Sequence, residues 1–262
     1  MLSKWKSFCM KHSYKLLVII IGVLLCCYSA ELFSSVKLDI CGTLFDLFET
    51  SQFIQIVPFL SCFPYILRIV EEKESGAYLQ YLVRYGKGRY VFSRMWRAAL
   101  SGASIMLEIC VIFLIVLLIY AKVKDVPVSM AASAQFQPLP GKTDTVSVMI
   151  SRGGEIRFFF LCMFGIALFG AVFPCIGAGV SFLVQNKRFL LVFPFLLMTV
   201  LIYALPDQLY MLNPNVLAPN FFWMNRNPWE LIAYMLGEFT VLFVFFGVIL
   251  FIGVERYGKG RK

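Results

Sequence analysis

The chemically most distinctive residues of this chain gather in one polar interval, residues 71–97. It opens with a cluster of three carboxylates at Glu71, Glu72 and Glu74. A short amphipathic helix is expected next, with four apolar or aromatic residues sharing one face at i, i+3, i+4 and i+7. These residues are Tyr78, Tyr81, Leu82 and Tyr85. We expect the acids at the start of this helix, where the helix dipole favours negative charge.

Two glycines are expected to end this helix. Gly86 and Gly88 follow it directly, and a basic, aromatic segment then runs from Arg89 to Arg97. The pattern predicts a rigid helix held between two apolar blocks of sequence. Such a helix can dock on another protein, or it can lie in the membrane interface and only anchor its loop. The residues by themselves leave both interpretations open.

Residues typical of catalysis are scarce. The chain has no G-x-x-x-x-G-K-[ST] phosphate-binding loop, so we expect it not to bind ATP in the usual way. Glu71 and Glu72 resemble the paired glutamates of membrane-embedded prenyl-protein proteases, but the only histidine is His12 in the basic N-terminal tail. The eight cysteines match no zinc spacing, and they are expected to act as small apolar fillers. We therefore expect no enzyme, metal site or cofactor in this chain.

Two further carboxylates, Glu108 and Glu238, fall inside apolar blocks. A carboxylate at membrane depth costs at least ~2.5 kcal/mol, so each should face the helix bundle or a wet cavity. No lysine or arginine lies at matching depth, so we expect each to be protonated or bonded to hydroxyls and amides. Two interpretations stay open. The pair can form a polar patch on a translocation path or dimer seam, or it can make ordinary hydrogen bonds within or between helices.

The elements that position these residues are apolar blocks of membrane-spanning length. Apolar residues make up 60% of the chain and charged residues 15%, a balance that a soluble domain of this length could not accommodate. Blocks of about 20 residues match the hydrocarbon thickness of a bilayer. The sequence therefore predicts one all-α membrane domain over residues 1–262, with six spans. These are Leu16–Phe33, Phe53–Val70, Ala98–Tyr120, Phe158–Val184, Phe189–Leu205 and Leu231–Val254.

Lysines and arginines predict the orientation of these spans. Seventeen of the 24 fall on the side that holds both termini, so both termini are expected to be cytoplasmic. Residues 1–15 are then an amphipathic interface helix, 71–97 a cytoplasmic loop and 122–157 the largest extracellular loop. Alternating apolar residues over Thr145–Ser151 predict a small hairpin in that loop. The net charge of +9 is explained by these membrane flanks, so nucleic acid is not an expected partner.

The polar interval resembles the first cytoplasmic loop of type-two ATP-binding-cassette (ABC) exporter permeases. The residues that carry the resemblance are Glu71-Glu72-Lys73-Glu74-Ser75-Gly76, Leu79, Leu82, Arg89, Tyr90 and Arg94. In that family an acidic, glycine-containing stretch opens a coupling helix that fits a groove on the nucleotide-binding subunit. The six spans, the cytoplasmic termini and the N-terminal helix also match. Two features depart from the family pattern. Ala77 stands where the family usually has threonine, and the usual proline is absent near Tyr85–Gly86.

The resemblance implies a permease subunit in the plasma (inner) membrane of a bacterium, exporting a hydrophobic or peptide-like cargo. ATP and magnesium would be bound by separate ATPase subunits, and a second permease chain, identical or not, would complete the transporter. The implied docking residues are Glu71, Glu72, Glu74, Gly76, Tyr78, Tyr81, Leu82, Tyr85 and Arg89. The alternative from another class is a stand-alone secondary transporter, which should show two repeated halves with interrupted spans at matching positions.

Overall fold

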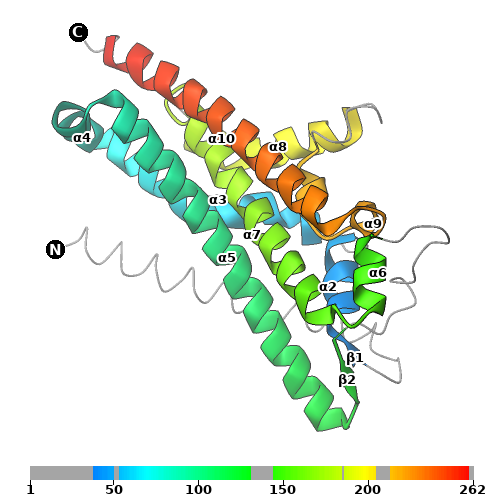
Figure 1. Ribbon diagram of the computed structural model, residues 1–262. Coiled ribbons are helices and arrows are strands. Elements are labelled where there is room, and N and C mark those ends of the chain that lie inside the picture. Colours follow the sequence, from blue (N-terminus) through cyan, green and yellow to red (C-terminus); the bar gives the residue numbers. More distant parts are fainter. Residues whose placement is uncertain (1–37, 50–52, 131–143, 185, 205–212, 260–262) are drawn as a thin grey trace.

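The computed structural model describes residues 38–49, 53–130, 144–184, 186–204 and 213–259. The predicted first span, Leu16–Phe33, and the predicted interface helix at 1–15 lie outside the described residues. The described part is almost entirely helical (Figure 1). Its elements in chain order are β1 (Leu38–Asp39), α2 (Ile40–Glu49), α3 (Phe53–Glu74), α4 (Ala77–Tyr85), α5 (Lys87–Lys124), β2 (Val128–Ser129), α6 (Val146–Ser151), α7 (Glu155–Val180), α8 (Lys187–Ala204), η3 (Pro214–Leu217), α9 (Phe221–Met224) and α10 (Pro228–Lys259).

Four described helices, α3, α5, α7 and α10, are long and apolar enough to cross a membrane. They correspond to the predicted second, third, fourth and sixth spans, although α7 ends at Val180, four residues before the predicted end of the fourth span. The predicted fifth span corresponds to α8, which forms a helix but is not among these four. The architecture is thus consistent with an all-α membrane protein, and the total of six spans stays a prediction.

Helix α7 lies at the centre of the bundle. Every residue from Phe169 to Phe182 is buried, and α7 packs against α3, α5, α8 and α10. Small residues allow this close packing, because a Cβ on Gly102 of α5 would overlap the carbonyl oxygen of Gly170 on α7. A Cβ on Gly179 would lie 2.9 Å from the carbonyl oxygen of Phe246 on α10. Small residues thus let α7 pack closely against α5 and α10.

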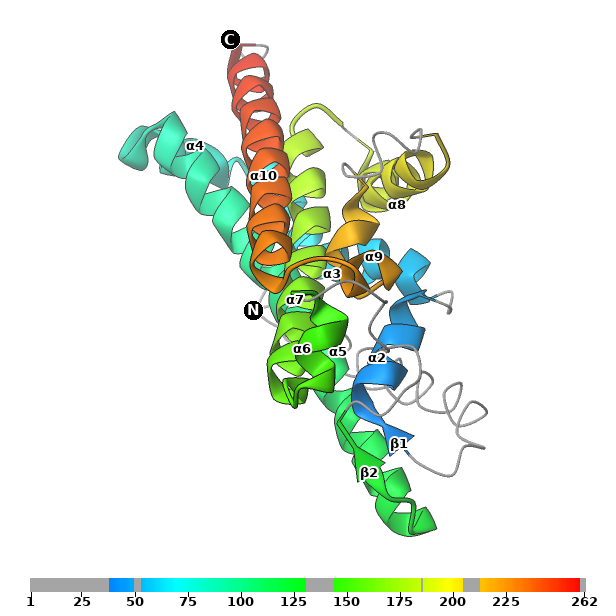
Figure 2. The same cartoon turned by 45° about the vertical axis from the view of Figure 1, so that its right-hand side comes forward.

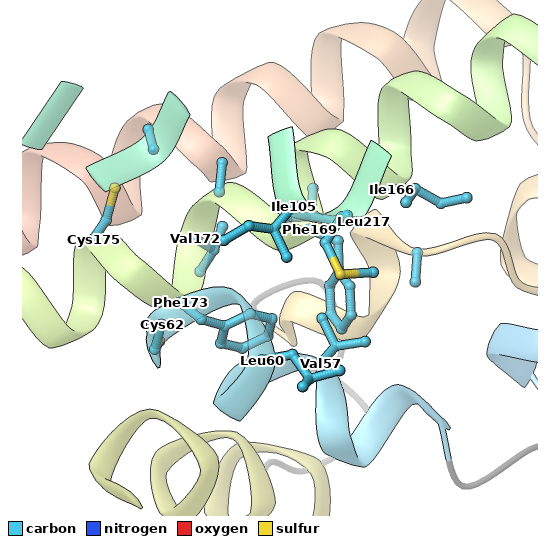
Figure 3. Packing of buried hydrophobic residues seen from close by; sticks show 14 of the residues in the cluster. Val57, Leu60, Cys62, Ile105, Ile166, Phe169, Val172, Phe173, Cys175 and Leu217 are labelled. Carbon is cyan, nitrogen blue, oxygen red and sulfur yellow. The ribbon is translucent and has the colours of Figure 1, made fainter. Parts of the chain in front are cut away.

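The core between these helices is aromatic and aliphatic. Figure 3 shows side chains from α3, α5, α7 and η3 converging, with the Phe169 and Phe173 rings near their centre. Those two rings pack edge to face at 4.9 Å between centroids. Cys62 and Cys175 lie in the same region, and all five described cysteines are buried and free. This placement confirms for these five the predicted role as apolar fillers.

At the end of the bundle away from α4, short elements pack beside α5 and α7 (Figure 2). Strands β1 and β2 form a two-residue parallel pair, and Asp39 accepts a hydrogen bond from the Gly42 amide at the start of α2. The predicted hairpin at Thr145–Ser151 is wrong, because Val146–Ser151 forms helix α6. Buried residues there include Ser147 between the apolar positions, so the alternation did not mark one exposed face.

Candidate functional site

Helix α4 forms a corner between the ends of α3 and α5. Gly76 before it and Gly86 after it both have positive φ, 71° and 77°, which a residue with a side chain adopts only with strain. The Gly86 amide donates to the Leu82 carbonyl and closes the helix. Gly86 therefore ends α4 as predicted, whereas Gly88 lies within the first turn of α5 and breaks nothing. Figure 1 places the corner at the same end of the bundle as the C-terminal end of α10.

The three glutamates lie in the last turn of α3, so their predicted place at the start of α4 is wrong. The helix dipole disfavours acids at a C-terminus, and two of the three are neutralised by cations. The Glu72 carboxylate lies 2.8 Å from the Arg94 guanidinium on α5 and 3.6 Å from Arg68. Glu74 pairs at 2.7 Å with Lys187 at the start of α8, in a half-exposed position.

Arg94 joins three helices. Its side chain is 3% exposed and that of Glu72 13%, so the pair is largely removed from water. The Arg94 guanidinium also lies over the rings of Tyr81 on α4 and Tyr90 on α5, at 4.9 and 5.2 Å. Its carbonyl oxygen accepts a hydrogen bond of 2.7 Å from the Tyr65 hydroxyl on α3. Movement of α4 is thereby linked to both α3 and α5.

Lys73 fastens the same corner to the centre of the bundle. Its ammonium donates to the carbonyl oxygens of Ser181 and Val184, at 3.0 and 3.1 Å, just beyond the end of α7. It also lies 4.8 Å from the ring centroid of Tyr257 on α10. A cation is favourable at a helix C-terminus, where carbonyl groups lack partners. Lys73 was not predicted as a site residue, although a lone lysine among three glutamates could have indicated its separate role.

Tyr78 is not available for docking. It is fully buried, with its ring 5.2 Å from Phe182 and 5.8 Å from Tyr257. Leu82 is also partly buried against the core. The four predicted residues do lie on one helix, α4, as expected. Two of them, Tyr78 and Leu82, pack α4 against the bundle. Burial removes Tyr78 from the surface that a partner could meet, whereas Leu82 keeps part of its side chain exposed and stays a predicted docking residue.

The exposed surface of α4 is nevertheless apolar and aromatic. Val83 is 89% exposed, and Leu79 is exposed one turn before it. The Tyr81 and Tyr85 rings are also exposed and stack at 6.3 Å on another side of the helix. We call the exposed surface formed by these two pairs, Leu79 with Val83 and Tyr81 with Tyr85, the α4 outer face. Val83 was not predicted, although its i, i+4 spacing from Leu79 marks a second apolar edge. Of the other predicted residues, Glu71 and Arg89 are exposed at the ends of this corner and Gly76 forms its turn.

The two intramembrane carboxylates differ. Glu108 is exposed on α5 among the described residues, so its place in the bundle, in a wet cavity or at a dimer seam stays a prediction. Glu238 on α10 is buried as expected, and neither of its oxygens has a hydrogen-bond partner in the described part of the chain. The described residues also include no group of three or more histidines, cysteines or acids that could hold a metal ion.

In comparisons with protein-family models, curated proteins and solved structures, none matches this chain. The resemblance to exporter permeases rests on the residues of the corner and on the expected layout of spans.

Proposed function

We propose that the chain is the membrane-spanning permease subunit of an ABC exporter. It moves a hydrophobic or peptide-like cargo across a bacterial plasma membrane, using ATP hydrolysed by a separate subunit. The α4 outer face docks on that ATPase. One observation carries the proposal: α4 is fixed tightly to the bundle through one side while an apolar, aromatic side is left exposed.

The fixed side of α4 suits the transmission of force. Arg94 links α4 to α3 and α5, while Tyr78 packs against residues at the ends of α7 and α10. A displacement of α4 by an ATPase would thus reach all four candidate spans through direct contacts. A helix that only anchored a loop in the interface would have no need for a buried ion pair at its base. The aromatic outer face is typical of interface anchors.

A second permease chain is the second partner in this proposal. The exposed side of α5 carries Ser101, Ser104 and Glu108 within a candidate span, and the Ser104 hydroxyl donates to the Ser101 carbonyl. An exposed carboxylate at membrane depth is costly against lipid. Packing this polar side against another helix removes it from lipid, and serines are typical of such contacts. We therefore place the permease seam along this side of α5.

The orientation follows from the charge asymmetry of the sequence. The corner with α4 lies on the side that holds most lysines and arginines, and the positive-inside rule makes that side cytoplasmic. An ATPase that uses cellular ATP must meet the permease on this side.

A photo-crosslinking experiment tests the proposed partner. A benzoylphenylalanine residue replaces Val83 in the full chain, expressed in its native cells, and the cross-linked protein is identified by mass spectrometry. The expected product carries a G-x-x-x-x-G-K-[ST] phosphate-binding loop. The matched control places the same probe at Val123, another exposed valine at the opposite end of α5. Products at Val83 that consist only of lipid would favour the stand-alone secondary transporter.

A further inference from the structure

A broad hollow lies at the end of the bundle opposite α4. Its volume is about 990 Å³, at the upper end of the range typical of small-molecule sites. Helix α6, the start of α7 and the start of α10 surround it, and Figure 2 shows α6 beside the start of α7. Nothing in the proposed docking of an ATPase uses this region.

The hollow carries an excess of positive charge. Arg152 and Arg157 line it, and Asp144 is the one acidic residue among its lining. The ion pairs of the described residues include neither arginine. Both arginines are exposed, so their guanidinium groups are accessible to a ligand. Arginine has the fork of donors that matches a phosphate group.

The start of α7 adds to this preference for an anion. Gly154 is the N-cap of α7 and has no side chain to accept from the amides of the first turn. Gly153 before it has a φ of 83°, a conformation that favours glycine. Both glycines line the hollow together with Arg157. Open amides and the helix dipole at this position favour a negatively charged group.

The rest of the lining is apolar and lies deeper along the same helices. Phe160 is 66% exposed, and Phe160, Phe164 and Ile232 line the hollow beyond the first turns of α7 and α10. Phe164 lies about 14 Å along the axis from the start of α7, at about 1.5 Å per residue. Both helices are candidate spans. Their first residues, with exposed Trp229, therefore lie at headgroup depth and the phenylalanines at hydrocarbon depth.

We propose that this hollow binds one anionic phospholipid. Arg152, Arg157 and the α7 amides hold its phosphate-bearing headgroup, and one acyl chain lies along Phe160, Phe164 and Ile232. The order of cations followed by apolar side chains along α7 matches the order of headgroup and chain in such a molecule. A free anion would leave the apolar part of the hollow unoccupied, and a zwitterionic phospholipid would bring its choline cation close to the two arginines.

Binding to the purified full chain in detergent tests this inference. Native mass spectrometry compares dioleoyl phosphatidylglycerol with dioleoyl phosphatidylcholine, which has the same acyl chains. We expect the anionic lipid to bind about 25-fold more tightly, since each of the two arginines contributes roughly a fivefold preference for anionic lipid and the two factors multiply. Glycerol phosphate, which is the headgroup without chains, should not displace it. Equal binding of the two lipids, or displacement by glycerol phosphate, would overturn the proposal.

Two variants locate the site. Arg152→Gln with Arg157→Gln should remove the preference for phosphatidylglycerol, and Ile232→Trp, which fills the apolar part, should weaken both lipids. The matched control is Lys122→Gln with Lys124→Gln, which removes the same charge from exposed positions at the end of α5. This control should retain the preference of about 25-fold. A preference that survives the arginine changes, or that the lysine control abolishes, would contradict a site in the hollow.

Discussion

Arg94 and Glu72 form the most buried ion pair among the described residues, and their arrangement decides how α4 is held. Two charges removed from water gain little net stability from their attraction, but either one left alone is strongly unfavourable. The pair therefore acts as a positional constraint between α3 and α5. Reversal of the Glu72 charge would therefore disrupt this corner itself.

Single removals of either partner test this role. Glu72→Ala and Arg94→Ala should each lower the free energy of unfolding by about 3 kcal/mol, and the double variant should lose clearly less than the sum. Glu74→Ala is the matched control, because its pair with Lys187 is half exposed and should contribute at most ~1 kcal/mol. Denaturant unfolding in detergent measures all four. Strict additivity would show that the two residues do not act as a pair.

Glu238 and Glu108 make a second contrast between single residues. Glu238 is buried without a hydrogen-bond partner among the described residues, a condition that costs about 1–3 kcal/mol. Glu238→Leu should therefore raise the free energy of unfolding by about 1 kcal/mol or more. Glu108→Leu, at an exposed position of α5, should change it by less than ~0.5 kcal/mol. A loss of stability in Glu238→Leu would reveal a partner for this carboxyl.

At the scale of elements, the contact of α5 with α7 depends on glycine. The backbones approach so closely at Gly102 and Gly170 that neither position has room for a side chain. Without a hydrophobic driving force in lipid, such close contact is what stabilises a pair of spans. A relative motion of α5 and α7 would have to separate this contact first.

A single methyl group tests the contact. Gly102→Ala should lower the free energy of unfolding by about 2 kcal/mol, because neither the Gly170 carbonyl nor Pro174 can yield without a backbone shift. Gly237→Ala on α10 is the control, since nothing lies within 4 Å of its Cβ position. There the change should be neutral or stabilising by up to ~1 kcal/mol, as helix propensity favours alanine. Equal effects of the two substitutions would contradict the packing argument.

Many of the helices could be predicted from the sequence, and the predictions that were wrong have identifiable physical causes. The apolar blocks predicted α3, α5, α7 and α10, and the aromatic periodicity predicted α4. The burial of Tyr78 could not be predicted, because its neighbours Phe182 and Tyr257 lie more than 100 residues away in the sequence. The acids were assigned to the wrong helix because the second span was expected to end at Val70, whereas α3 continues to Glu74. Helix α6 was missed because both of its sides are buried.

The partner of Glu108 is a further feature that the sequence predicted only in part. A cost of burial in lipid predicts that Glu108 needs a polar partner, but it does not say whether the partner lies in the same chain. Among the described residues, the side of α5 that carries Glu108 is exposed. The partner that we propose for Glu108 is therefore a second permease chain. Truncation of Leu82 would alter folding as well as docking, because this residue is partly buried against the core.

For the whole molecule, two separate regions lie toward opposite ends of the bundle. Figure 1 shows α4 at one end and α6 toward the other, and residues of α6 line the hollow. The proposed orientation places α4 in the cytoplasm. Cysteine labelling in intact cells checks it, with the unchanged chain as background. Val123→Cys should react with a membrane-impermeant maleimide at once, and Val83→Cys only after lysis. Labelling in the reverse order would invert the topology and remove α4 from the side that holds ATP.

The docking of the α4 outer face on an ATPase is tested most directly by Val83→Asp against Val123→Asp. Both valines are exposed, at 89% and 75%, so neither change should disturb the fold. Copurification of the ATPase is measured at matched expression, together with stimulation of its hydrolysis. The account predicts that Val83→Asp weakens binding by about thirtyfold, or ~2 kcal/mol, and abolishes stimulation, while Val123→Asp keeps both. Full binding and stimulation with Val83→Asp would contradict the account, and α4 would then be an interfacial anchor.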